Sequence, residues 1–590
     1  MKKEIKESLN IALSSLDEKS KVDLSSTEIE IKENKGKKFG DYSTNLALIL
    51  AQKLKIEPEK IAKSLIKKIP ANPSLEKIEF AKPGFINFFV KEGGHSEILK
   101  AINREKEDFG LSFKSSPNKK KKILIEYVSS NPTGPLHVGH GRGAAFGSVL
   151  SSILRALGHA VDEEYYVNDQ GRQVDILTVS VLIRYEQLLD NKMPFPEGCY
   201  QGDYIKLYAK KISKLKKENH LVPPSKKNLL ITEIKRIKKD EDLDILIKFL
   251  KENLKERFHE TKKFILQEII SSIKLDLKKL GVKQNLWFKE TTLYRSLNKK
   301  PSLMNKVKTS LKKTGFIYEK EGALWFKSTK FNDDKDRVIE KENGQATYFA
   351  SDIAYHFDKY QRGYDKIINV WGADHHGYLP RVRSAMLALK QDPKKLEVIF
   401  IQFASLLRKG KKISMSTRGG EFISLSELME EVSAEAARFF FINSKAEQHL
   451  DFDLDLAKEE SKDNPLYYVQ YAHARICSVF KKLNSENKKY DYDLGKKNIS
   501  ILSGDREIGI QKLLSQFPEV ILRAANNYEP HLICYYLRNL ASSFHSYYNE
   551  ERFLVENEEE LQARLFMLKA IKQVLFNGLS LLGLSSPTSM

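Results

Sequence analysis

The sequence predicts an α/β protein with a doubly wound parallel sheet, preceded by a small α+β domain and followed by an α-helical bundle. Three observations predict this order. The apolar stretch ILIEYV (residues 123–128) is followed by a helix-like segment that ends at Gly158 and then by a second strand-like stretch, AVDEEYYVND. A strand, a helix and a strand in succession are the unit of a parallel sheet. Residues 1–112 mix helical and strand-like patterns, whereas residues 461–590 are helical almost throughout.

The first domain, residues 1–112, contains one helical segment and one strand pair. YSTNLALILAQKLKIEPEKIAKSLIKKI has helical spacing, with Pro58 at a helix start. IEFAKPGFINFFV alternates around Pro83-Gly84, which predicts two strands and a turn. The polar stretch SSPNKKKK (residues 115–122) then reads as a linker.

The second domain, residues 120–460, carries the predicted sheet. ILIEYV is short, apolar and β-branched, as a buried parallel strand is. Residues 205–290 are Lys-rich and helical, and we interpret them as an insertion. We expect the sheet to resume near GALWFKSTKF and KIINVWGADHHGYLPRV. The third domain, residues 461–590, is the helical bundle.

Composition limits the classes of protein that remain. The chain has 590 residues with 99 Lys plus Arg against 78 Asp plus Glu, a net charge of +21, which favours a polyanionic partner. Solvated lysine-rich helix faces are the alternative explanation. No apolar run of membrane-spanning length and no signal peptide are seen, so we expect no membrane contact. The three cysteines are far apart, which fits a reducing cytoplasm.

Two histidines, His137 and His140, follow the strand ILIEYV and allow three interpretations. They could be metal ligands together with His375-His376, although H-x-x-H is not the spacing of helical zinc proteases. They could be ordinary capping or core histidines. They could also donate to phosphate oxygens at a helix N-terminus, because no Walker-type phosphate loop occurs in the chain.

The third interpretation matches a family. HVGH followed by GRG resembles the HIGH motif of class I aminoacyl-tRNA synthetases, and the downstream KKISMSTRGG (residues 411–420) resembles their KMSKS motif. Arginyl-tRNA synthetases are the finer match. The stretches that carry it are EYVSSNPTGPLHVGHGRGAAFG, YYVNDQGRQ, YQGDYI, ATYFASDIAYH, WGADHHGYLPRV, FGDYSTNLAL, KPGFINFFV and DNPLYYVQYAHARICSVFKK.

The resemblance implies a Rossmann-like catalytic domain that activates L-arginine with ATP and transfers it to the terminal adenosine of tRNA(Arg). Mg²⁺ would arrive with ATP, and we expect a monomer. The catalytic residues implied are His137, Gly139, His140, Lys412 and Arg418. The ATP-binding residues implied are Pro132, Gly134, His137, Gly139, His140, Gly141, Met415 and Ser416.

Arginine recognition requires negative charge, since a guanidinium is always charged and prefers bidentate carboxylates. The resemblance implies Glu126 and Asp352 as these acids, with Tyr348 against the side chain. Glu126 lies in an apolar strand, which is a costly place for an unpaired charge. It could instead be paired to a structural arginine or lie at an exposed edge, and Asp352 could simply start a helix. Further candidates are Ser130, Asn131, Asp374 and His375.

The second motif departs from the family pattern. Where KMSKS offers its second lysine to pyrophosphate, this chain has Thr417. Many arginine enzymes that lack this lysine carry another one just before HIGH, but this chain has Gly134 at that place. We expect the cation from Lys412 or Arg418, with Lys409 and Lys411 as further candidates.

Contacts to tRNA are implied at both ends of the chain. In the first domain Phe39, Tyr42 and Asn45 resemble residues that touch the tRNA elbow, and in the bundle Arg475 and Lys481 are candidates for phosphate contacts. The bundle's tyrosines are either stacking platforms for anticodon bases or core. Enzymes that resemble this chain need bound tRNA before they activate arginine.

Two other classes of function compete with this interpretation. A synthetase paralogue that only binds RNA would have lost His137, Gly139, His140 or Glu126, and all four are present. A metal-dependent hydrolase would need a zinc ligand set.

Overall fold

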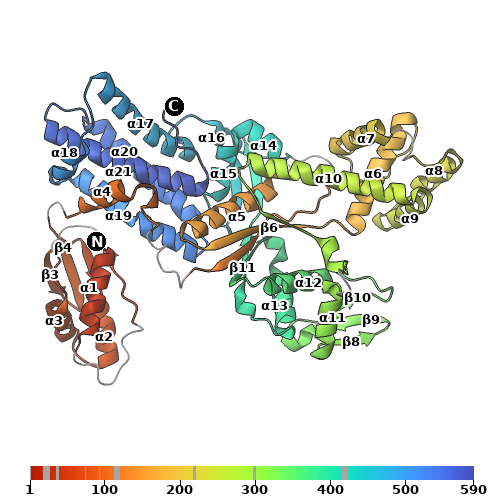
Figure 1. Ribbon diagram of the computed structural model, residues 1–590, viewed down its shortest axis with the longest axis horizontal. Coiled ribbons are helices and arrows are strands. Elements are labelled where there is room, and N and C mark those ends of the chain that lie inside the picture. The colour runs from red at the N-terminus through yellow and green to blue at the C-terminus, as the bar shows by residue number, and fades with distance from the viewer. Residues whose placement is uncertain are drawn as a thin grey trace.

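The computed structural model shows an elongated molecule with the parallel sheet in its middle (Figure 1). The structure describes residues 2–16, 27–34, 39–72, 75–91, 94–111, 120–216, 221–296, 301–413 and 423–590. The N-terminal unit and the helical bundle lie at one end of the view, and a helical arm and a small antiparallel unit lie at the other.

The N-terminal unit packs three helices on a four-stranded antiparallel sheet, of order β1-β2-β4-β3. Its elements are α1 (Lys2–Ser14), β1 (Lys32–Glu33), β2 (Tyr42–Thr44), α2 (Leu46–Leu54), α3 (Pro58–Lys68), β3 (Leu75–Ala81) and β4 (Phe85–Val90). The predicted strand pair around Pro83-Gly84 is confirmed, because Ala81 pairs with Phe85. Pro58 begins α3 as predicted, since its missing N–H is not needed at a helix start.

The central sheet is parallel throughout, with the order β12-β11-β5-β6-β7. Its strands are β5 (Lys122–Glu126), β6 (Ala160–Val167), β7 (Leu286–Lys289), β11 (Lys366–Gly372) and β12 (Leu396–Ile401), and α5 (Val138–Ala156) joins β5 to β6. From β5 the chain first adds β6 and β7 on one side of the sheet, and later adds β11 and β12 on the other side. The order therefore reverses between β5 and β11, where doubly wound sheets bind their ligands.

One predicted strand lies in a different sheet. GALWF forms β9 (Ala323–Phe326), which pairs with β8 (Ile317–Lys320) and β10 (Arg337–Glu340) in an antiparallel sheet, so the prediction that the parallel sheet resumes there was wrong. Glu321 and Gly322 both have positive φ and close a two-residue hairpin between β8 and β9. Such a hairpin satisfies its hydrogen bonds locally. This unit also contains α11 (Leu303–Lys313), α12 (Tyr348–Gln361) and α13 (Leu379–Ala388).

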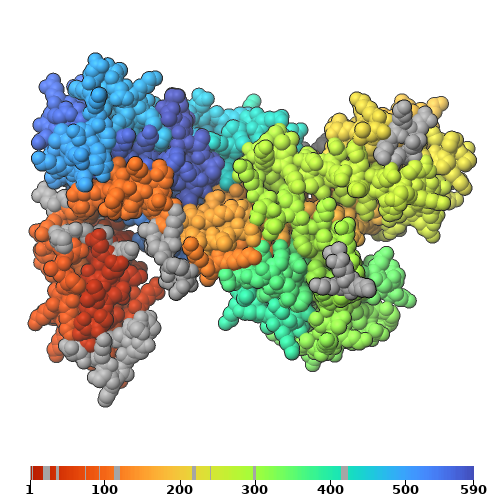
Figure 2. All heavy atoms as spheres, in the orientation of Figure 1, coloured from red at the N-terminus to blue at the C-terminus, as the bar shows by residue number. Residues whose placement is uncertain are grey.

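The Lys-rich insertion is a helical arm that projects from the sheet (Figure 2). It comprises α7 (Asp203–Lys216), α8 (Lys227–Arg236), α9 (Leu243–Leu254) and α10 (Glu256–Lys279), against α6 (Arg172–Leu189). Leu230, Leu243, Leu250 and Phe258 are buried in its core. The long helix α10 returns the chain to the sheet at β7.

The C-terminal bundle contains α17 (Pro465–Ser485), α18 (Tyr492–Lys497), α19 (Asp505–Asn526), α20 (His531–Glu550) and α21 (Glu558–Leu582). Helix α4 (Glu97–Glu105), which falls within the predicted first domain, packs here instead: the Asn103 amide donates to the Phe566 carbonyl at 3.1 Å. Among the described helices α21 alone is long and apolar enough to cross a membrane, and it is mostly buried in this bundle.

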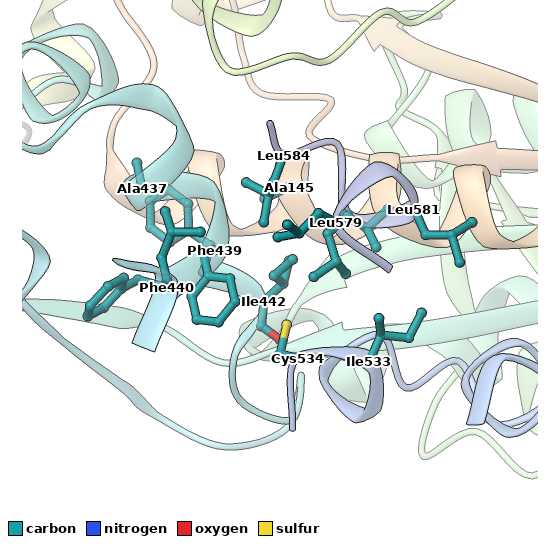
Figure 3. Packing of buried hydrophobic residues seen from close by; sticks show 14 of the residues in the cluster. Ala145, Ala437, Phe439, Phe440, Ile442, Ile533, Cys534, Leu579, Leu581 and Leu584 are labelled. Atoms are coloured by element: carbon teal, nitrogen blue, oxygen red, sulfur yellow. The ribbon is translucent and has the colours of Figure 1, made fainter. Parts of the chain in front are cut away.

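The bundle and the domain that contains the parallel sheet share one hydrophobic core (Figure 3). Ala145 of α5, Phe439 of α15 (Ala434–Ile442), Cys534 of α20 and Leu579 of α21 meet there. The remaining elements of this junction are β13 (Ala404–Arg408), β14 (Lys411–Lys412), α14 (Leu425–Val432), β15 (Leu450–Asp453) and α16 (Leu454–Lys458). A shared core gives the bundle a rigid connection to the helix that carries the two histidines.

Candidate functional site

The two histidines form the first turn of α5, beside the switch point of the sheet. His137 is the N-cap, and its Nδ1 accepts the Gly139 N–H at 3.1 Å. The His140 Nδ1 accepts the His137 N–H at 3.3 Å, and the two rings stack with centroids 3.7 Å apart. Because each Nδ1 is an acceptor, the proton of each neutral ring lies on Nε2. The rings therefore cap the helix with one nitrogen and keep an N–H donor on the other.

Burial holds both rings neutral at physiological pH. It lowers the pKa of His140 to about 3, with the charge of His137 as a second cause, and it lowers the pKa of His137. Neutral donors at a helix N-terminus suit an anion, because the helix dipole adds favourable potential without a fixed positive charge. The capping and the phosphate interpretations are thus compatible.

The glycines of this turn have different surroundings. A Cβ at Gly139 would meet only the His137 ring, and one at Gly143, a turn later, would meet nothing within 4 Å. This strip of α5 is open to a ligand. A Cβ at Gly141 would instead lie 2.6 Å from the Leu425 side chain. Gly141 faces the core, so in this structure its small size serves helix packing rather than the nucleotide.

At the carboxyl end of β5, Glu126 is buried and already has a cation. Lys359 of α12 donates to one oxygen of Glu126, and Ser129 Oγ donates to the other at 2.8 Å. Asn369 of β11, which pairs with Glu126 in the sheet, accepts a second bond from Lys359 at 2.8 Å. An internal ion pair therefore lies at the switch point.

Two further acids lie close by without a cation. Burial raises the pKa of Asp352 to about 7, with the nearby charges of Glu126 and Glu290 as further causes, and Tyr378 donates to its carboxylate. Burial also raises the pKa of Glu290, to which Ser351 and Tyr166 hydrogen-bond. Within the described part of the chain neither carboxylate forms an ion pair. A buried acid and a half-buried acid that lack an ion-pair partner there are suited to a cationic ligand.

Glu290 was missed by the sequence prediction. It follows β7 directly, in the short helix η8 (Glu290–Tyr294), so it lies at the carboxyl end of a parallel strand. In the sequence, Glu290 is the acid in LWFKETTLY. Its place at a strand end could be predicted only if LWFK had been assigned to the parallel sheet.

The other predicted arginine-binding residues surround this region unevenly. Tyr348, one helical turn before Asp352, is 63% exposed. Ser130 is buried against the Tyr165 hydroxyl at 2.7 Å, and Asn131 is exposed and donates to Gln173 at 2.9 Å. Asp374 and His375 are exposed and 3.4 Å apart in η10 (Ala373–Tyr378), the short helix that brings Tyr378 to Asp352.

Part of the second motif lies outside the described residues, namely Met415, Ser416, Thr417 and Arg418. Lys412 is described: it ends the hairpin of β13 and β14 and lies 3.5 Å from Asp451. Beyond the motif, Ser424 bridges to His137, and the Leu425 N–H donates to the Leu136 carbonyl at 2.7 Å. The chain that leaves the second motif is thus bound to the histidine turn.

Family models match nearly the whole chain. They are an arginyl tRNA synthetase N-terminal domain over residues 1–90, a class I (R) tRNA synthetase catalytic domain over 110–451 and a DALR anticodon-binding domain over 469–590. The chain belongs to the arginyl-tRNA synthetase family. Arginine–tRNA ligases of Legionella pneumophila (strain Paris) and Coxiella burnetii (RSA 493) are 46% and 44% identical to it. The matches cover 95% of both chains for the first, and 100% of this chain and 99% of its relative for the second.

A solved structure supports the same fold. Thermus thermophilus arginyl-tRNA synthetase superposes with a TM-score of 0.72 over all of both chains at 22% identity. The enzyme therefore uses ATP to activate L-arginine and charges tRNA(Arg) in protein synthesis.

The zinc alternative lacks a ligand set among the described residues. No group of three or more His, Cys, Asp or Glu side chains is arranged there to hold a metal. His376 stacks on Phe400 with centroids 4.2 Å apart, and His375 pairs with Asp374.

Residues predicted to touch tRNA have mixed exposure. Phe39 is exposed, but Tyr42 is buried in the core of the N-terminal unit and faces Ser515 of the bundle, so it is not accessible to RNA in this arrangement. Asn45 is half-buried at the start of α2. On α17, Lys481 is exposed, and the Arg475 guanidinium lies 4.7 and 4.6 Å from the ring centroids of Tyr471 and Tyr548.

Proposed function

We propose that this synthetase binds the guanidinium of arginine between Asp352 and Glu290. The observation that carries the proposal is that a buried acid, Glu290, lies near a half-buried one, Asp352, and that neither has an ion-pair partner among the described residues. A planar guanidinium can offer parallel N–H donors to two carboxylates. Neutral citrulline would leave the acids unneutralised, which explains selection without a dedicated editing step.

We assign the other predicted arginine-binding residues to positions around these two acids. Glu126 contributes through Lys359 rather than by direct contact. Tyr348 covers the substrate from the open side. Ser130 and Asn131, after β5, hold the α-amino end, and Asp374 and His375 line the entrance.

The ATP half of the site uses neutral donors. The Nε2–H groups of His137 and His140 donate to phosphate oxygens as negative charge develops on them, and the open strip at Gly139 and Gly143 admits the adenosine. Pro132 and Gly134 shape the turn beneath, and Gly141 supports it from the core. We place Met415 and Ser416 against the nucleotide, and Lys412 or Arg418 against pyrophosphate.

Mg²⁺ enters with ATP. It is held mainly by phosphate and water oxygens, as Mg²⁺ in nucleotide enzymes usually is. When bound, it would supply positive charge that offsets the charge of the phosphate oxygens.

On the RNA side, we propose three domains over residues 1–112, 120–460 and 461–590, with the first and third binding tRNA. Phe39 and Asn45 contact RNA directly, Tyr42 supports them from below, and Arg475 and Lys481 contact phosphates.

We place the enzyme in the cytoplasm as a monomer without membrane contact. The unpaired cysteines Cys199, Cys477 and Cys534 fit that compartment.

A crystal structure of the full chain with arginine and a non-hydrolysable ATP analogue tests the site. The expected result is a guanidinium within hydrogen-bond reach of Asp352 and Glu290 and triphosphate oxygens at the two Nε2 atoms. A guanidinium bound to Glu126, with Lys359 displaced, would overturn the assignment. ATP–pyrophosphate exchange measured with and without tRNA tests the expected dependence on tRNA.

A further inference from the structure

A completely buried lysine lies directly beneath the proposed arginine pocket. Lys359 is 0% exposed, and lysines are rarely buried to that extent unless they are paired. Its ammonium donates to Glu126 and to the Asn369 side-chain oxygen, and it lies 4.2 Å from the centroid of the Tyr355 ring. All three N–H donors of Lys359 therefore have an acceptor or a ring, which makes this a complete site for a fixed positive charge.

The lysine is also connected to the backbone of Asp352. The Asn369 side-chain nitrogen lies 2.8 Å from His356 Nε2, and His356 Nδ1 lies 2.8 Å from the Asp352 carbonyl oxygen. With the amide donating to Nε2, the imidazole donates from Nδ1 to that carbonyl. This chain of bonds joins β11 to the turn of α12 that presents Asp352, so it fixes the position of the acid.

Lys359 reduces the excess of negative charge around the proposed arginine site. Three acids lie here, and the charges of Glu126 and Glu290 both act on Asp352. The substrate side chain brings a single positive charge. Since Lys359 neutralises Glu126 internally, two acids remain for one guanidinium.

We propose that Lys359 is a positioning residue that determines arginine selection without touching arginine. It holds Glu126 in an internal ion pair, so that the guanidinium is met by Asp352 and Glu290 alone. This inference rests on the arginine site proposed above.

Several groups face Asp352 from the elements packed around it, and all belong to the charge balance. They are Glu126 on β5, Tyr166 on β6, Glu290 and Tyr294 on η8, His356 and Lys359 on α12, and Tyr378 on η10. Removing Lys359 leaves an unpaired Glu126 beside Asp352, which favours the protonated form of Asp352. Removing the charge of Glu126 leaves an unpaired ammonium, which favours the ionised form of Asp352 and repels the guanidinium.

The test is the pH profile of the arginine KM in tRNA-dependent ATP–pyrophosphate exchange, measured on the full-length enzyme and on three variants. We expect Lys359→Met to move the midpoint of the profile to higher pH and Glu126→Gln to move it to lower pH, each by about half a pH unit or more. Glu126→Gln also raises the arginine KM about tenfold at high pH. The double variant, which removes both charges, returns the midpoint and the KM toward wild type.

A merely structural role would not produce opposite shifts, since it would lower kcat and thermal stability in both single variants. An unchanged midpoint in Glu126→Gln, or a double variant whose midpoint does not return toward wild type, would overturn the proposal, and this holds even if Lys359→Met fails to fold. The Asp352→Asn variant distinguishes failure of the proposed arginine site from failure of the proposed role of Lys359. If its arginine KM equals that of wild type, the pocket itself is misplaced. If that KM rises while the other variants show no opposite shifts, only the role of Lys359 fails.

Discussion

The proposed arginine half and the proposed nucleotide half of the site lie at the same edge of the sheet, but the first consists of acids and the second of neutral histidines. Burial raises the pKa values of Asp352 and Glu290 and lowers those of His137 and His140, so it favours the neutral form in both halves. The halves differ in what a ligand changes. An arriving guanidinium restores the charge of the acids, whereas the imidazoles stay neutral donors. On this proposal, one half recognises a cation through carboxylate charge, and the other recognises an anion through fixed dipoles.

The largest expected effect is on the arginine half. Replacing Asp352 with Asn removes a charge that the guanidinium needs but keeps the size of the side chain. We expect kcat/KM for arginine in the exchange assay to fall by about 10³-fold, because a charged bidentate contact is lost in a buried site. The ATP KM should stay within about threefold.

Asp358→Asn is the matched control for this change. Asp358 lies on the same helix but pairs with Arg362 at 3.1 Å. A comparable loss in this variant would show that any acid on α12 matters, and it would remove the distinction between the two halves.

A smaller loss is expected in the nucleotide half. His140→Ala removes one neutral donor, and we expect arginine activation to fall by about 10²-fold, as for the loss of one preorganised donor. Affinity for tRNA, measured by filter binding, should hold. His259→Ala, on the projecting arm, should retain wild-type activation, and near-normal activity of His140→Ala itself would exclude His140 from catalysis.

The pH dependence of the arginine KM and of the ATP KM distinguishes the two halves in the wild-type enzyme. Asp352 must be ionised to bind a guanidinium, and its raised pKa of about 7 means that binding is strongest above that pH and weakens as pH falls through it. The arginine KM should therefore rise about tenfold between pH 8 and pH 6. The pKa of His140, about 3, lies far below this range, so the ATP KM should stay level. Parallel changes in both KM values would contradict the comparison.

The smallest effect concerns RNA. Lys481→Ala removes one exposed cation of α17, and we expect the tRNA KM to rise about threefold, with the salt dependence of binding reduced by roughly one ion. The arginine KM at saturating tRNA should not change. Lys330→Ala, in the small antiparallel unit, is the control.

Local patterns predicted much of the fold, because they depend on neighbours in the chain. The strand before the histidines, the helix after them, the strand pair around Pro83-Gly84 and the helical bundle were all confirmed. The assignment of GALWF to the parallel sheet failed, since a short apolar run does not indicate which sheet a strand joins. The RNA-contacting role of Tyr42 was drawn from motif resemblance, which does not report burial.

By itself the sequence determined the family, the reaction and the two histidines, since motifs and their order are properties of the chain. Only the tertiary structure showed which of the candidate acids has a cation beside it. Glu126 looked like the arginine ligand until the fold brought Lys359, more than two hundred positions later, against it, and Glu290 became a candidate only when β7 joined the sheet. Whether a buried acid can bind a cationic ligand depends on whether another residue already pairs with it, and that residue can be distant in the sequence.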